Sequence, residues 1–139
     1  MTRLPDWLER LTLYLDGVVA RPYDPVAHNC ATFILDVVHA VTGETPLEVL
    51  ARIKLELPDT EFGVARLLAE RGGMRGIAIE TFGELNEFVM QARRGDIALF
   101  NTGHGETLGV VENNGALCVT PEGLWRFDLK GSMGFWRLG

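Results

Sequence analysis

The chain has 139 residues, of which 47% are hydrophobic and 23% charged, a composition typical of one globular domain and unlike that of a disordered or fibrous chain. Its formal net charge is −6, from 13 Lys and Arg against 19 Asp and Glu, and an acidic chain without a basic block is poorly suited to bind nucleic acid. Two cysteines are too few for a disulfide scaffold, and no apolar run approaches the length of a membrane span. We therefore expect a single domain over residues 1–139, with no nucleic acid partner and no membrane span.

Apolar residues at helical spacing dominate residues 1–93. The first predicted helix covers residues 5–20 and is broken by Pro22 and Pro25. Asn29 is a plausible N-cap for a second helix that stops at Gly43, and Thr45 to Glu48 is a capping box that opens a third. The predicted helices therefore cover residues 5–20, 30–42, 45–54, 61–71 and 81–92.

The pattern changes in residues 94–139, where short apolar runs alternate with turn residues. Asn113-Asn114-Gly115 is a strong hairpin signal between two of these runs. We expect strands over residues 97–100, 108–111, 116–120, 123–127 and 134–138. Helices followed by strands predict an α+β fold, in which amino-terminal helices pack on a carboxy-terminal antiparallel sheet of four to six short strands.

Cys30 lies in the first turn of the second predicted helix. A helix N-terminus favours the thiolate, which is the nucleophilic form of cysteine, and the backbone amides there could form an oxyanion hole. The alternative is that Cys30 is a small buried hydrophobic residue on the apolar face of the helix. The sequence leaves both interpretations open, and it also leaves open whether Cys30 pairs with Cys118, which we expect in the core of a strand.

A nucleophilic thiol needs a nearby base, normally histidine, and the chain has three. His39 is nine residues along the same helix, about 13 Å away, and on the opposite face. His28 is expected to make a turn or cap contact. His104, in a glycine-rich turn, could approach Cys30 if its hairpin packs beside the helix start. The histidines and cysteines have no metal-ligand spacing, so we predict neither a metal nor a cofactor.

Three segments resemble the NlpC-type bacterial cell-wall cysteine peptidases, in order and spacing over about residues 20–130. The resemblance implies a papain-like NlpC-type fold in which Cys30 is the nucleophile. The matching segments are Asn29-Cys30-Ala31-Thr32-Phe33, Arg94-Gly95-Asp96-Ile97-Ala98-Leu99-Phe100, and Leu108-Gly109-Val110-Val111 with the turn Asn113-Asn114-Gly115.

The chain is more similar to an offshoot of this family that is encoded in phage and prophage tail gene clusters. This resemblance implies a component of a virion tail tip or baseplate, made in the cytoplasm of a host bacterium and held by hub and distal tail proteins. The absence of a signal peptide at the amino terminus agrees with cytoplasmic synthesis. The motifs that carry the resemblance are His28-Asn29-Cys30-Ala31-Thr32-Phe33, which has the pattern His-x-Cys-Ala-x-Phe, then Thr42-Gly43-Glu44-Thr45-Pro46, Gly63-Val64-Ala65-Arg66, Gly72-Gly73, Pro121-Glu122-Gly123-Leu124 and Trp136-Arg137.

The peptidases carry their catalytic histidine immediately before the strand that corresponds to residues 108–111, and Thr107 occupies that position here. Threonine cannot act as a general base at neutral pH, and His104 is three residues away. The first hypothesis is therefore a structural tail component with catalysis lost or atypical. The second is an active cysteine peptidase or amidase that cleaves peptidoglycan, with His104 as the base. The third is a module that binds a small molecule or peptide in the former cleft.

Overall fold

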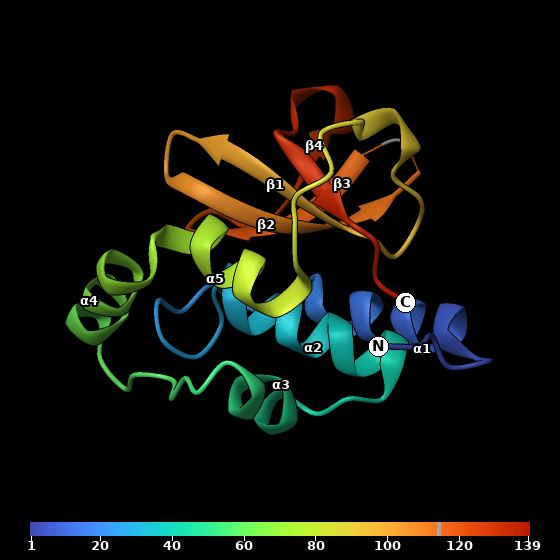
Figure 1. Cartoon of the computed structure of the whole chain (residues 1–139). Coiled ribbons are helices and arrows are strands. Elements are labelled where there is room, and N and C mark those ends of the chain that lie inside the picture. The colour runs from blue at the N-terminus through green and yellow to red at the C-terminus, as the bar shows by residue number, and fades with distance from the viewer. Residues whose placement is uncertain (114) are drawn as a thin grey trace.

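The computed structural model describes residues 1–113 and 115–139. It contains five α-helices followed by a five-stranded antiparallel sheet (Figure 1). The helices are α1 (Trp7–Val18), α2 (Cys30–Thr42), α3 (Pro46–Arg52), α4 (Glu61–Arg71) and α5 (Gly73–Phe82). The strands are β1 (Ile97–Thr102), β2 (Gly105–Glu112), β3 (Gly115–Thr120), β4 (Gly123–Asp128) and β5 (Gly134–Trp136), with short 3-10 helices at Val89–Gln91 and Leu129–Gly131. The predicted α+β class with helices first and strands second is confirmed.

The sheet has the strand order β4-β3-β2-β1-β5, so four consecutive strands form a meander and β5 returns to pair with β1. The pairing of Glu112 with Gly115 confirms the predicted hairpin between β2 and β3, although Asn114 in its turn lies outside the described residues. The strands reach further than predicted at the other hairpin, where Thr102 pairs with Gly105 and leaves only Gly103 and His104 in the turn.

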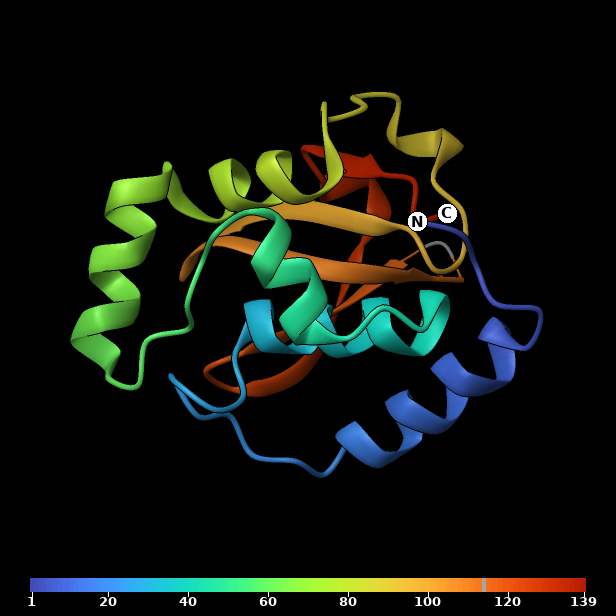
Figure 2. The ribbon, with the colours of Figure 1, turned by 60° about the horizontal axis from the view of Figure 1, so that its bottom comes forward.

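The main hydrophobic core lies between the helices and one face of the sheet. Helix α2 is central, because Phe33, Val37 and Val41 are completely buried between α1 and the strands. A smaller cluster covers the other face of the sheet, where Phe100 and Cys118 pack under Leu129. Figure 2 shows α1 and α2 below the strands and α4 displaced to one end of the molecule. No described helix has the length and apolarity needed to cross a bilayer.

The helix predicted over residues 81–92 is wrong. Helix α5 instead begins at Gly73, directly after Gly72 ends α4 in the left-handed conformation, and Gly83 terminates it with φ +97°. The chain then runs extended, and Asn86 forms a β-bridge with Phe135. The apolar residues that suggested a helix, Leu85, Phe88, Val89 and Ala92, do not share a buried face, since Phe88 is 73% exposed.

Candidate functional site

The amino terminus of α2 is held by the Asn29 cap that the sequence predicts. The Asn29 side chain accepts hydrogen bonds from the amides of Ala31 and Thr32, each at 3.0 Å. In return the Thr32 hydroxyl accepts from the Asn29 amide at 2.9 Å, which completes a capping box. This reciprocal cap fixes Cys30 as the first residue of the helix.

The Cys30 side chain is half-buried and packs against the main core and the start of β2. Burial raises the pKa of the Cys30 thiol, and the backbone amides of Leu108, Cys30 and Ala31 offset part of this increase. No imidazole contributes to the shift. The environment therefore favours the neutral thiol, whereas catalytic cysteines depend on a lowered pKa.

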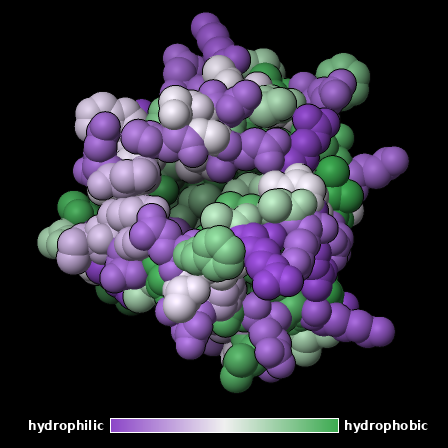
Figure 3. All heavy atoms as spheres, turned by 90° about the vertical axis from the view of Figure 1, so that its left-hand side faces the viewer, coloured by the Kyte–Doolittle hydropathy of each residue, from purple (hydrophilic) through white to green (hydrophobic). Residues whose placement is uncertain are grey.

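Cys30 lines a cavity of about 220 Å³ between α2, α3, α4, α5 and the start of β2. Its wall is mostly aliphatic, and Figure 3 shows a hollow with hydrophobic atoms at its floor at the α4 end of the molecule. Helix α4 contributes Val64 and Leu68 to the wall, yet none of its residues is buried. The cavity is therefore covered on one side by a loosely packed helix.

His104 borders the same cavity but is directed toward the solvent. It lies in the turn between β1 and β2, its side chain is 45% exposed, and its Nε2 is 3.7 Å from Glu122 Oε1. The structure thus brings Cys30 and His104 to one cavity, and it places the imidazole next to a carboxylate of the β3–β4 turn.

The other two histidines have the structural positions that the sequence suggests. His39 is exposed near the end of α2. His28 is 2% exposed, and its backbone forms a β-bridge with Asp24. Its Nδ1 has no hydrogen-bond partner among the described residues, and its pKa is lowered by burial and by the charge of Arg21.

Thr107 is buried at the start of β2 and borders the cavity next to Leu108, whose amide contacts the Cys30 thiol. The position that the peptidase resemblance assigns to the catalytic histidine is thus close to Cys30, but it carries a hydroxyl. Glu106, which the sequence analysis did not single out, also lines the cavity. Its Oε1 accepts a hydrogen bond from the Arg75 amide at 3.3 Å. Alternation along β2 gave a signal for it, because Glu106 shares the helix-facing side of the strand with Leu108.

Cys118 is fully buried on the opposite face of the sheet from Cys30, in the cluster that contains Phe100. Both thiols are free. Burial is the main cause that raises the pKa of Cys118. Because the sheet separates the two side chains, a bond between Cys30 and Cys118 would require strand β3 to reverse its alternation.

The described residues contain no group of three or more His, Cys, Asp and Glu side chains placed to hold a metal ion. The acidic residue of the Arg94-Gly95-Asp96 motif lies away from the cavity and contacts both chain ends. Asp96 is completely buried and accepts hydrogen bonds from Arg3 and from the Leu138 amide. The motif therefore joins the termini to β1.

These features define an α+β protein with an apolar cavity whose wall carries a neutral, half-buried thiol at a helix N-terminus. Residues 2–138 match the family model described as Domain of unknown function (DUF6950), so the chain belongs to this family. No curated protein and no solved structure matches the chain.

Proposed function

We propose that the protein is a structural component of a phage or prophage tail tip or baseplate, built on a papain-like NlpC-type fold that has lost its catalysis. The observation that supports the loss of catalysis is that, among the described residues, no imidazole perturbs the Cys30 thiol, while His104 at the edge of the same cavity is 45% exposed and lies 3.7 Å from Glu122. Removal of the base from a cysteine and histidine pair costs orders of magnitude in rate. In this proposal the fold is retained because it serves as a structural scaffold.

The papain-like assignment is supported by the arrangement of Cys30 at the start of α2, packed against the strand that begins at Gly105. The tail assignment depends on the ordered motifs from His28 to Trp136 that resemble proteins of tail gene clusters. Large apolar side chains on the surface are suited to contacts with neighbours such as hub and distal tail proteins. They include Phe62, Phe88, Met90 and Trp125.

The test uses tail particles from the bacterium that encodes the protein. The particles are produced either by induction of a prophage or by infection, and are then purified. Mass spectrometry of purified tails should find the chain at a fixed ratio to the other tail proteins. Particles that carry Cys30→Ala should assemble and infect as well as the wild type. The proposal is overturned if the chain is missing from purified particles.

The alternative is an active cysteine peptidase or amidase that cleaves peptidoglycan during tail penetration. The observation in its favour is that Cys30 and His104 line one cavity. Purified protein should then release peptides or amines from cell walls, and Cys30→Ser and His104→Ala should each abolish that release. Our proposal predicts no release by the wild type, and a loss of infectivity in Cys30→Ala particles of normal composition would favour the enzyme instead.

A further inference from the structure

We infer that the cavity beside Cys30 is a binding site for a small amphiphile that carries one apolar group next to a positively charged amino group. This inference goes beyond the structural role proposed above and does not depend on it. Three properties of the cavity carry it: its volume, its aliphatic wall and the charge at its polar end.

The volume is suited to a single apolar group. An engineered apolar cavity of about 150 Å³ binds benzene, so the 220 Å³ found here can take a larger group, with roughly six to ten carbon atoms. Such a space is far larger than the voids of a well-packed core. The wall is formed by aliphatic side chains from four helices, among them Ile34, Leu50, Val64, Leu68 and Ile77.

Among the described residues, the cavity has one carboxylate, Glu106, and it lies at the end where α2 meets the β1–β2 and β3–β4 turns, whereas Thr81 of α5 adds only a hydroxyl elsewhere on the wall. Asn29, Cys30 and Glu106 border the cavity there. Glu106 Oε1 accepts a hydrogen bond from the Arg75 amide in the first turn of α5. A ligand would therefore have its apolar group between the helices and its polar group at this end.

The charge at the polar end of the cavity determines which charge on the ligand is favoured. None of the described residues that line the cavity is Lys or Arg. Glu106 and His104 line it, and Glu122, outside the lining, lies 3.7 Å from the His104 imidazole. A carboxylate ligand would meet like charge there, and an ammonium group would meet opposite charge. The site consequently prefers a cationic head over an anionic one.

The binding test uses three probes that share an eight-carbon hydrocarbon chain and differ in the polar group: octylamine, octanol and octanoate. Binding is measured at pH 8 as protection of Cys30 from methyl methanethiosulfonate, followed by mass spectrometry, with buried Cys118 as an internal reference. We expect octylamine to protect Cys30 at concentrations about tenfold lower than octanoate, with octanol between them. The inference is overturned if octylamine gives no protection or if octanoate protects equally well.

Two pairs of variants locate the site. Glu106→Gln keeps the acceptor for the Arg75 amide and removes the charge, so the tenfold preference should shrink to about twofold. Glu87→Gln, an exposed acid outside the cavity, should leave it unchanged. Val64→Phe fills the cavity from α4 and should abolish protection by octylamine, whereas Ala65→Phe, on the exposed side of the same helix, should not.

Circular dichroism confirms that each variant is folded before it is compared. If Val64→Phe and Ala65→Phe bind octylamine alike, the ligand is not in the cavity and the inference is wrong. A failure of these binding tests leaves the experiment on purified tail particles unaffected.

Discussion

Asp96 and Cys30 both belong to motifs that resemble those of a peptidase, but their surroundings differ in packing. The two oxygens of Asp96 accept hydrogen bonds from the Arg3 side chain and from the Arg93 and Leu138 amides, at 2.8 to 3.2 Å. Cys30 lines an open cavity whose cover, α4, has no buried residue. The comparison shows that the motif around Asp96 stabilises the fold, whereas the motif around Cys30 borders an unfilled cavity.

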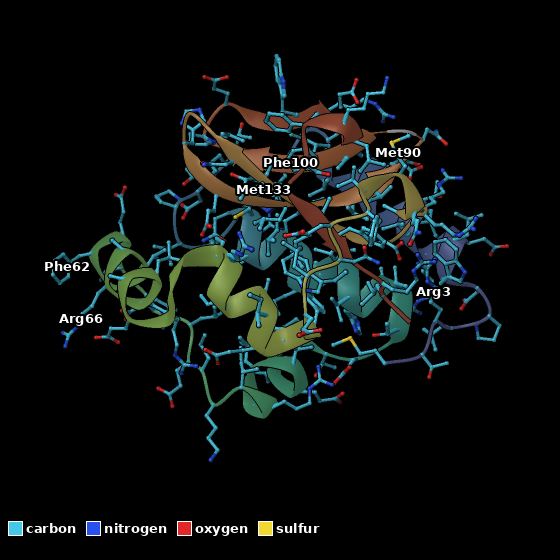
Figure 4. The ribbon with its side chains drawn as sticks, turned by 45° about the horizontal axis from the view of Figure 1, so that its top comes forward. Arg3, Phe62, Arg66, Met90, Phe100 and Met133 are labelled. Atoms are coloured by element: carbon cyan, nitrogen blue, oxygen red, sulfur yellow. The ribbon has the colours of Figure 1, made fainter. Side chains whose placement is uncertain are left out.

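The network at Asp96 explains why the chain ends lie side by side in Figures 1 and 2. Arg3 donates to the Leu138 carbonyl at 2.6 Å as well as to Asp96, and it lies over the ring of Trp7. In Figure 4, Arg3 lies at the end of the molecule opposite Phe62 and Arg66, which point outward from α4. The tightly connected end and the open end of the molecule are therefore far apart.

The largest expected effect on stability is at Asp96, where the two chain ends meet. Asp96→Ala would leave the buried partners of the carboxylate unpaired and should lower the free energy of unfolding by about 3–5 kcal/mol. Urea denaturation followed by circular dichroism measures it. The exposed control Asp59→Ala should change stability by less than about 0.5 kcal/mol. Equal effects of the two substitutions would show that Asp96 does not join the termini.

A second comparison contrasts packed and open apolar positions. Leu11 is 1% exposed under α2, and Leu11→Ala should cost about 2–5 kcal/mol in unfolding free energy. Leu68 is half-buried at the cavity, so Leu68→Ala should cost only about 1 kcal/mol. The same denaturation assay applies, and an equal loss at both positions would mean that the cavity is closed in solution.

A substitution at Gly95 should have a smaller effect on stability, caused by its positive φ and by close contacts of the added Cβ. Its φ is +88°, and a Cβ there would lie 2.9 Å from Trp7 Cζ3 and 3.0 Å from Arg3 Nη1. Gly95→Ala should therefore destabilise the protein by about 1–3 kcal/mol. At Gly103 a Cβ would meet nothing within 4 Å, so Gly103→Ala is the matched control and should be nearly neutral.

The smallest expected effect is a pH dependence that comes from His28. Because burial lowers its pKa from the ordinary value of 6.5, the unfolded chain binds a proton more readily than the folded one. The folded state should therefore lose stability as the pH falls below about 6.5. Melting curves between pH 7 and pH 5 should show a smaller decrease for His28→Gln than for wild type, with exposed His39→Gln as the control. Parallel curves for all three proteins would contradict this origin.

The sequence predicted the elements whose signals are local. The Asn29 cap places Cys30 at the start of α2, and the turn at residues 113–115 specifies the hairpin of β2 and β3. Residues 73–92 were not predicted correctly, because Gly72 allows one helix to follow another without a loop and Gly83 ends it early. In that segment the backbone of Asn86 pairs with Phe135, 49 positions later, a contact that helical spacing cannot reveal.

The candidate site was predicted only in part. Cys30 and Thr107 could be located from their motifs, and the structure places both at the cavity. The cavity itself, and the position of Glu106 at its polar end, depend on how four helices pack around β2. Alternation along β2 indicates only that Glu106 faces the helices, and no short sequence pattern encodes the packing of the four helices that forms the cavity.

The pH dependence of Cys30 alkylation tests the central claim, that this thiol has no base. Iodoacetamide modification of the folded protein is followed by mass spectrometry from pH 6 to pH 10, with Cys30→Ser to assign the signal. Since burial raises the pKa of Cys30, we predict slow modification at pH 6 and a midpoint above that of a free cysteine, about 8.5. Rapid modification at pH 6, with a midpoint below that of free cysteine, would show an activated thiolate and contradict the account.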